Sequence, residues 1–376
     1  SKVKILCLIF GLIKIGEITN HLEQIAPLHY QESYDNSGLI TGNKEHKVKQ
    51  ALITLDCTEE IVEEAIAKKC ELIIAHHPIV FKGLKKLNGK NYVERTIIKA
   101  IQNNIAIYAI HTNLDNVHNG VSKKICDKLG LANCQVLSPK SDLLRKLIVF
   151  CPSSHAAKVR SAICNAGAGQ IGDYDHCTFN SIGKGTFRGN QNTNPFIGKR
   201  LEIHQETEIK VEAVFPSHLQ GTILAAMYQE HPYEEVAYDI IPLHNKHQNI
   251  GSGMIGTLDK PMKSDAFLKF VKKQIQTDCI RHTKTVKKEV QKIAVCGGSG
   301  SFLLANAKQM QADVFITADF KYHEFFDAEN DLIIADIGHY ESEQFTKELI
   351  QDILKENFPK FATHLSELNT NPINYL

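Results

Sequence analysis

A short apolar run that ends in two adjacent histidines constrains the fold of this chain more than any other stretch. The run Leu72–Ala75 is followed directly by His76, His77 and Pro78. An apolar run bounded in this way predicts a buried strand, which the proline should end. Neighbouring strand side chains point to opposite faces, so both imidazoles serve one site only if the chain turns or if they flank two metal ions. Taken alone, the pair is more typical of partly buried, hydrogen-bonded structural histidines.

Two further apolar runs, at residues 105–110 and 332–335, end in the same residue types. The first leads into His111 and Asp115, and the second leads towards His339 and Glu343. Because His339 and Glu343 are four positions apart, a helix would place them on one face. Imidazole combined with carboxylate suits zinc, iron, manganese or nickel. One carboxylate can also bridge two ions roughly 3.5–4 Å apart, which is a known hydrolytic arrangement.

With these motifs in place, the chain resembles the GTP cyclohydrolase I type 2 homologue family, the Nif-three-like proteins. The resemblance rests on His-His-Pro at 76–78, on 111–115 and on Gly-His-Tyr-Glu-Ser-Glu at 338–343, and it extends over nearly the whole chain. It implies two divalent metal ions, zinc, iron or manganese, at a dinuclear site. The ligands that the resemblance implies are His76, His77, Asp115, His339 and Glu343. It places His111 near that site, as a neighbour or an occasional ligand.

Composition describes an ordinary soluble globular protein of 376 residues, with 43% hydrophobic and 23% charged residues. A formal net charge of +1 provides no global field to attract nucleic acid or an anionic membrane. The ten cysteines form no Cys-x-x-Cys pair, so we interpret them as reduced thiols in a cytoplasmic protein. The apolar stretch at residues 5–13 is too short to span a bilayer, and Lys14 and Glu17 follow it without a cleavage motif.

The order of the expected elements predicts an α/β protein with an insertion. Strands and helices alternate up to about residue 130, which favours a largely parallel sheet. The pattern breaks at residues 138–140, and a β-α-β-β-α-β order follows, as in a ferredoxin-like module. This module resembles the PII-like or CutA-like insertion of some family members. The predicted parts are an extension at 1–13, a first α/β part at 14–140, the inserted α+β domain at 141–245 and a second α/β part at 246–376.

Several residues beyond the expected ligands are candidates for the site. Asp35 and Asn36 lie in a turn-rich loop that the family places near the metal cleft, so we expect them to contact substrate. The glycine turn at 297–301 follows a predicted strand, and its simplest interpretation is a tight strand-to-helix connection. His111, His323 and Glu343 are the candidates for proton transfer. The segment 231–235 carries one histidine and two carboxylates, and we favour a structural turn there over a ligand site.

Two classes of function remain open at this point. In the first, a metal-activated water attacks a small nucleotide-like or phosphoester substrate. In the second, the protein is a non-catalytic metal-binding regulator or scaffold whose insertion senses a ligand or forms the assembly. The family resemblance also implies a homohexamer, with no membrane or nucleic acid partner expected. The exposed strand edges of the insertion are consistent with pairing between copies.

Overall fold

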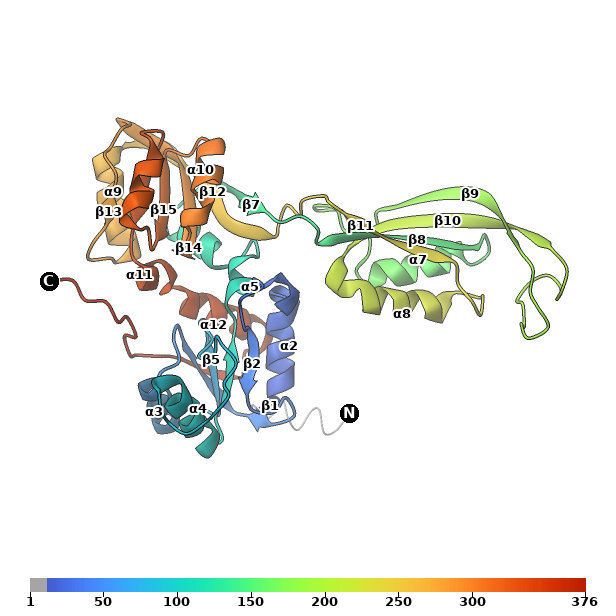
Figure 1. The fold of residues 1–376 in the computed structure, drawn as a ribbon, viewed down its shortest axis with the longest axis horizontal. Helices are drawn as coiled ribbons and strands as arrows, with labels where there is room; N and C mark the ends of the chain where they lie inside the picture. The colour runs from blue at the N-terminus through green and yellow to red at the C-terminus, as the bar shows by residue number, and fades with distance from the viewer. Residues whose placement is uncertain (1–11) are drawn as a thin grey trace. The chain divides into compact units, whose positions relative to one another are not determined.

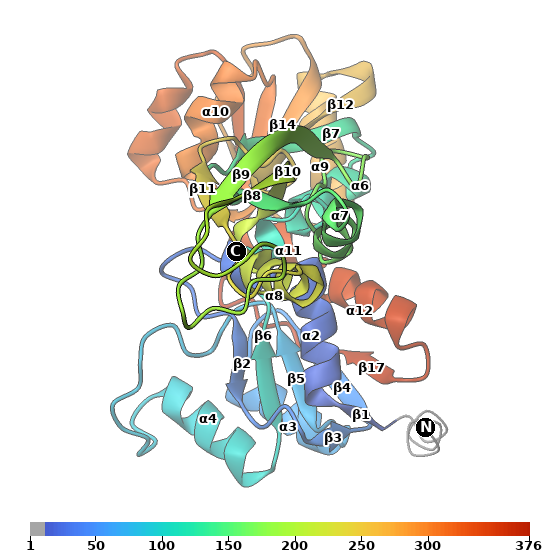
Figure 2. The same ribbon diagram turned by 90° about the vertical axis from the view of Figure 1, so that its right-hand side faces the viewer.

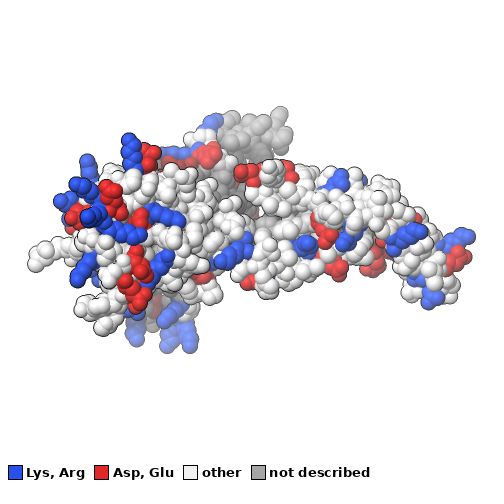
Figure 3. Space-filling model, turned by 90° about the horizontal axis from the view of Figure 1, so that it is seen from above, with Lys and Arg blue, Asp and Glu red and all other residues white. Residues whose placement is uncertain are grey.

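A computed structural model describes residues 12–376, and the start of the predicted extension at 1–13 lies outside the described residues. The chain forms two compact units (Figure 1). The main unit contains the chain up to Pro139 together with Gln248–Leu376, and the inserted unit is Lys140–His247. Within the described residues, no helix is long and apolar enough to cross a membrane. Acidic and basic side chains are interspersed over the face seen in Figure 3, in keeping with the small net charge.

The first sheet of the main unit has five strands in the order β17-β4-β5-β6-β2, and only β2 is antiparallel to its neighbour. Its strands are β2 (Gly38–Thr41), β4 (Gln50–Thr54), β5 (Leu72–Ala75), β6 (Ala106–Ala109) and β17 (Ala362–Leu365). The helices around it are α2 (Ile15–Ile25), α3 (Glu59–Ala67), α4 (Tyr92–Gln102) and α12 (Thr346–Asn357), and a small pair, β1 (Ile13–Lys14) and β3 (Lys47–Val48), lies beside α2. Apolar side chains of α3 and α4 share one core with β4, β5 and β6. Thr58 caps α3, where its hydroxyl accepts a hydrogen bond from the amide of Ile61.

The second sheet has six strands in the order β13-β16-β15-β14-β12-β7, with β14, β15 and β16 parallel. Its strands are β7 (Ala132–Pro139), β12 (Gly251–Lys263), β13 (Arg281–His282), β14 (Glu289–Ser299), β15 (Val314–Ala318) and β16 (Ile333–Asp336). The surrounding helices are α5 (Thr112–Asp115), α6 (Val121–Lys128), α9 (Ser264–Ile275), α10 (Leu304–Gln309) and α11 (His339–Glu343), with short 3-10 turns η1 (Leu28–Tyr30), η3 (Ser301–Leu303) and η4 (Tyr322–Ala328). Ser264 is the first residue of α9, and its hydroxyl donates a hydrogen bond to the Lys287 carbonyl.

The main unit therefore contains two sheets, one mostly parallel and one mixed, where the sequence predicted a single largely parallel sheet (Figure 2). Apolar runs identify strands but not their partners, because the partners are chosen by packing over long sequence separations. Strand β7, from the first half of the chain, pairs with β12 in the second sheet. Strand β17, near the C-terminus, pairs with β4 in the first sheet. Strands of both sheets end near the middle of the unit, and the predicted ligands follow those ends.

The inserted unit is an antiparallel four-stranded sheet in the order β11-β8-β10-β9, with two helices packed against one face. Its elements are β8 (Leu144–Pro152), α7 (Ala156–Asn165), β9 (Thr178–Phe187), β10 (His204–Pro216), η2 (Ser217–Leu219), α8 (Gln220–Glu230) and β11 (Tyr238–Leu243). The β-α-β-β-α-β order and this strand arrangement confirm the predicted ferredoxin-like module. Helix α7 starts after His155, whose side chain makes no capping hydrogen bond.

Candidate metal centre

Three strand ends bring the predicted ligands together in the main unit. His76 and His77 follow β5, His111 and Asp115 belong to the turn and helix α5 after β6, and His339 and Glu343 form the first and last residues of α11 after β16. The ring centroids of His76 and His77 are 5.0 Å apart, and that of His111 is 5.3 Å from both. The chain therefore turns after β5 enough for both histidines to face one cluster.

Each of the four imidazoles is held through its Nδ1 atom. His76 Nδ1 lies 2.8 Å from the carbonyl oxygen of Ile110, and the other three Nδ1 atoms each meet a carboxylate. These pairs are His77 with Asp56 at 2.8 Å, His111 with Asp35 at 2.8 Å and His339 with Asp319 at 2.6 Å. Carbonyl and carboxylate oxygens only accept, so every Nδ1 must donate. In the neutral imidazole this leaves the lone pair on Nε2, the atom that a metal ion would use.

The carboxylate of Glu343 lies at the centre of the cluster. Its Oε2 atom is 2.9 Å from His77 Nε2 and 3.1 Å from His339 Nε2. Its Oε1 atom is on the side of His76, 3.8 Å from the Nε2 atom of that ring. One carboxylate thus presents a different oxygen to each of two histidine sets.

The side of the cluster around His76 contains polar atoms that have no hydrogen-bond partner among residues 12–376. His76 Nε2 and Asp115 Oδ1 are both buried without a hydrogen bond, and they lie 3.6 Å apart. Burying such atoms unpaired costs roughly 1–3 kcal/mol each. An imidazole nitrogen and a carboxylate oxygen that face each other without hydrogen bonds are suited to bind one cation together. The donor set and these orphaned atoms therefore fit a metal ion.

Electrostatics in the metal-free protein already favour negative charge at Glu343. Burial alone would raise the pKa of this carboxyl, but His339 and His77 beside it hold the pKa well below its usual range. Burial disfavours positive charge on His77 and His339, yet Glu343 and the aspartate partners outweigh it. The pKa is raised to about 10 for His77 and to about 11 for His339. Both imidazoles consequently carry a second proton that a metal ion would have to displace.

Three overlapping groups of side chains have ligand atoms close enough to hold a metal ion. They are His76 with His77 and His111, His77 with His339 and Glu343, and His76 with Asp115 and Glu343. In each group the ligand atoms all lie within 4.8 Å of one another. Glu343 is common to the last two groups, and those two groups share no other member.

The cluster opens into a cleft of about 920 Å³ within the main unit. The side chains that line it include the aromatic residues Tyr34, Phe81, Tyr92, Phe302 and Tyr340, together with Lys82. The C-terminal segment at residues 370–373 also lines the cleft. The Thr370 hydroxyl donates to Asp56 Oδ2 at 2.6 Å, so this segment helps to fix the aspartate that holds His77.

Known proteins resemble this chain over nearly its whole length. Residues 13–372 match the family described as Duf34/NIF3 (NGG1p interacting factor 3). The chain belongs to the Duf34/NIF3 family. Its relatives include proteins named GTP cyclohydrolase 1 type 2 homolog from Halalkalibacterium halodurans, 39% identical over 94% of this chain and 96% of that protein, and from Bacillus subtilis, 38% identical over 96% and 98%. A crystal structure of a Bacillus cereus protein related to NIF3 has a TM-score of 0.84 and 37% identity, over 97% of this chain and 99% of that one. The predicted Nif-three-like family and fold are confirmed.

One predicted site residue of this Duf34/NIF3 protein lies away from the cluster. His323, expected to handle protons, is exposed on η4 and does not line the cleft. Its ring packs on Tyr322 and Phe326. The 3-10 turn directs His323 outward, and it is Asp319, four positions earlier, that reaches His339.

Asp35 has a different role from the one its loop suggested. Its side chain is fully buried behind His111 and also accepts hydrogen bonds from the Thr112 hydroxyl and amide. Burial opposes its charge, but these hydrogen bonds outweigh it and hold the pKa of Asp35 below its usual range. Asp35 therefore orients His111, and neither it nor Asn36 lines the cleft.

Two contributors in this Duf34/NIF3 chain escaped sequence reasoning. Asp56, the partner of His77, follows the strand β4 just as the histidines follow β5, and that position was the available signal. Gly298, in the glycine turn, has φ +63°, and a Cβ there would collide with Glu343 Oε1. The backbone at Gly298 therefore lies so close to the Glu343 carboxylate that only a residue without a side chain fits there.

Proposed function

We propose that the main unit is a dinuclear metal hydrolase that acts on a small nucleotide-like or phosphoester substrate. The observation that carries the proposal is the position of Glu343. Its two oxygens face different histidine sets, and the orphaned donors of His76 and Asp115 lie on one of those sides. A carboxylate with this environment is suited to bridge two ions.

The proposal assigns each ligand a place. His77, His339 and Glu343 would hold one ion, while His76, Asp115 and Glu343 would hold the other. The mixture of imidazole and carboxylate suits zinc, iron or manganese. The partners Asp56, Asp319 and the Ile110 carbonyl keep each Nε2 directed inward, and they raise the basicity of the rings.

When bound, the ions would lower the pKa of a water molecule and supply a hydroxide nucleophile near neutral pH. His111 is the residue placed to move protons, because Asp35 fixes its Nδ1 and its ring lies 5.3 Å from His76. Glu343 stays ionised at the centre of the cluster and stabilises the positive charge around it. The proposal leaves out His323.

The cleft supports a small substrate with a flat ring and a negative charge. Its volume of about 920 Å³ is in the range of small-molecule sites. Aromatic rings such as Phe81 and Tyr92 offer stacking surfaces, and Lys82 offers a charge for phosphate.

Elemental analysis and turnover test the proposal together. Metal-replete protein should hold two ions per chain, His76→Ala and His339→Ala should each lose about one, and Glu343→Ala should weaken both. A panel of nucleotides and phosphoesters should be hydrolysed by the loaded protein and not by Glu343→Ala. His323→Ala is the matched histidine control and should keep full activity. At most one ion per chain would rule out the dinuclear site, and an absence of turnover across the panel would favour a metal-binding regulator.

We also propose that the protein assembles into a homohexamer. The edge strand β9 pairs only with β10, which leaves its other edge open for another chain. Closed symmetry such as D₃ would combine dimeric and trimeric contacts. Light scattering at micromolar concentration should give six times the mass of one chain, and a monomer mass would end the idea.

A further inference from the structure

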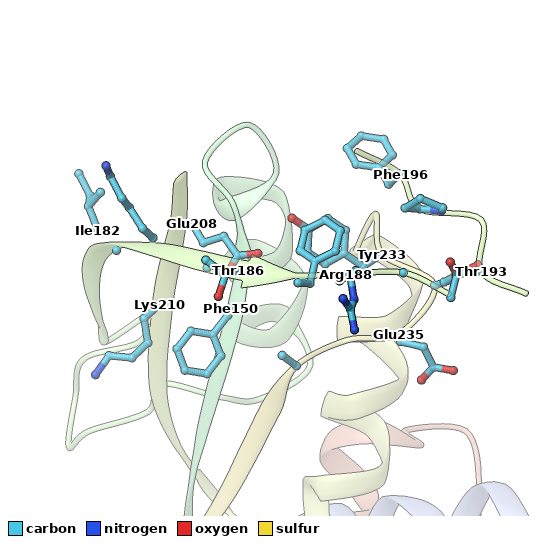
Figure 4. Close-up of a pocket in the computed structure, with 18 of the residues that line it drawn as sticks. Phe150, Ile182, Thr186, Arg188, Thr193, Phe196, Glu208, Lys210, Tyr233 and Glu235 are labelled. Carbon is cyan, nitrogen blue, oxygen red and sulfur yellow. The ribbon is translucent and has the colours of Figure 1, made fainter. Parts of the chain in front are cut away.

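The inserted unit contains a cavity of its own, separate from the metal centre. It has a volume of about 590 Å³ and lies against β9 and β10, the loop that follows β9, and the segment that follows α8 (Figure 4). Every residue that lines it belongs to the inserted unit. Cavities of roughly 300–1,000 Å³ are the usual size for small organic ligands.

Aromatic side chains form much of the cavity wall. The ring of Tyr233 lies 5.9 Å from that of Phe187 and 6.4 Å from that of Phe196, measured between centroids. Phe150 lines the same cavity (Figure 4). Phe196 is 54% exposed although its ring lies near those of Tyr233 and His155. An incompletely covered group of aromatic rings is suited to stack on a flat ligand.

The strand beside these rings leaves room for such a ligand. Gly183 and Gly185 both line the cavity, and a Cβ on Gly183 would meet nothing within 4 Å. Glycine within a strand weakens it and is typical of places where another group approaches the backbone closely. The backbone is therefore open at Gly183, whereas the space beside Gly185 is taken by the carboxylate of Glu208.

The cavity also contains two charged groups that the protein leaves available. Arg188 forms no hydrogen bond or ion pair with any of residues 12–376. Glu208 lies beside the Tyr233 hydroxyl, and burial together with this carboxylate raises the pKa of Tyr233, so the hydroxyl keeps its proton. Figure 4 shows Arg188, Glu208 and Tyr233 around the same space. An unpaired guanidinium is suited to bind a carboxylate or a phosphate, and a carboxylate is suited to accept from an N–H group.

We propose that this cavity binds a small molecule composed of a flat aromatic ring, an amino or ring N–H donor and one anionic group. The ring lies among Phe187, Phe196 and Tyr233, the anion pairs with Arg188, and the donor meets Glu208. The anionic group is a carboxylate or a phosphate, since both suit the guanidinium equally. This site is independent of the proposed hydrolytic activity.

Ligand-observed NMR titration of the full chain tests the proposal. Protein freed of metal is used so that no probe can bind through ions in the other cleft. The probes are 2-aminobenzoate and adenosine monophosphate, which have a ring, an amino group and an anion. Benzoate lacks the amino group, and aniline lacks the anion. We expect at least one complete probe to bind, about tenfold more tightly than the probe that lacks either group. The stronger of the two complete probes identifies the anion.

Variants connect the binding to this cavity. Arg188→Gln should weaken the complete probe about tenfold, and Glu208→Gln should remove the preference for 2-aminobenzoate over benzoate. Arg160→Gln is the matched control, because Arg160 lies on α7, outside the cavity. Circular dichroism checks that each variant is folded. The proposal is overturned if neither complete probe binds at millimolar concentration, or if Arg188→Gln and Arg160→Gln bind equally well.

Discussion

At the scale of single residues, the histidines of the site are oriented by the oxygen atoms that their Nδ1 atoms contact. Each Nδ1 meets an oxygen acceptor, and this interaction decides which ring nitrogen is free for a ligand. The same acceptors set the charge of the cluster before any ion arrives. Metal affinity and the pH dependence of stability should therefore both respond to residues that touch no ligand.

Removing the carboxylate charge of the aspartate that contacts one histidine should weaken metal binding without unfolding the protein. Asp319→Asn and Asp56→Asn should each lower metal affinity about 10–100-fold, because the imidazole loses the carboxylate that orients it and raises its basicity. Competition with a chelator of known affinity measures the change. Asp352→Asn is the control, since Asp352 forms a surface ion pair with Lys124 at 3.2 Å. If the three variants bind metal equally, the aspartates do not support the site.

The metal-free protein should lose stability as the solution becomes alkaline. The pKa is raised to about 10 for His77 and about 11 for His339, above the ordinary value of about 6.5. Their ion pairs with the carboxylates therefore stabilise the fold fully below pH about 6.5, and this contribution is lost as the pH rises towards the folded-state values. The free energy of unfolding should fall by up to ~1.4 kcal/mol per pH unit for each histidine.

Urea unfolding of the chelator-treated protein at several pH values measures this slope. His339→Ala should flatten it, whereas the exposed His323→Ala should leave it unchanged. With metal present the trend should weaken or reverse, because the ligands must lose their protons to bind. An unchanged slope in His339→Ala would show that the cluster does not control alkaline stability.

At the scale of elements, short helices and turns at strand ends place the ligands. The helix α11 spans only His339–Glu343, so its two end residues are one turn apart and face the same side. The glycine turn after β14 passes directly against them, and Gly298 supplies the space for the Glu343 carboxylate. The precision of the site thus depends on backbone that carries no ligand itself.

Adding one methyl group to that turn should damage the metal site selectively. In Gly298→Ala the Cβ would occupy the position of Glu343 Oε1, so we expect loss of most metal binding. Gly130→Ala is a close control, because Gly130 has φ +65° and nothing within 4 Å of the added Cβ. Both variants should lose about 1–2 kcal/mol of stability from the left-handed backbone. Elemental analysis and thermal unfolding separate the two effects, and equal metal content in both variants would contradict this role of Gly298.

At the scale of the whole molecule, the insertion lies between β7 and β12, two strands of the main unit that pair with each other. Pro139 and Gly251 are paired residues of neighbouring antiparallel strands, so the chain leaves and re-enters the main unit at adjacent points. The predicted ligands come from both sides of the insertion, and all of them lie in the main unit. The main unit should therefore be able to form its site alone.

Replacing residues 140–247 with a short glycine-serine linker should leave a folded protein that still binds metal. The expected metal content per chain equals that of the full-length protein, because no proposed ligand is removed. Circular dichroism and elemental analysis measure the result, and a linker variant that also carries Glu343→Ala is the negative control. A well-folded remnant without metal affinity would show that the insertion contributes to the site.

The sequence alone determined the family, the inserted module and the six side chains that meet at the candidate site. It could do so because apolar runs that end in histidine and carboxylate identify strand ends, and the family resemblance assigned those ends to one site. These signals are local, and they persist whichever strands eventually pair.

Only the tertiary structure decided the division into two sheets, the partners of the histidines and the outward position of His323. Asp56 and Asp319 reach their histidines across 21 and 20 positions of sequence, and Thr370 reaches Asp56 across 314. Such contacts depend on how whole strands pack, so neither hydrophobic periodicity nor residue spacing encodes them. The cavity of the inserted unit arises in the same way, since its aromatic wall is assembled from separate segments around Phe187, Phe196 and Tyr233.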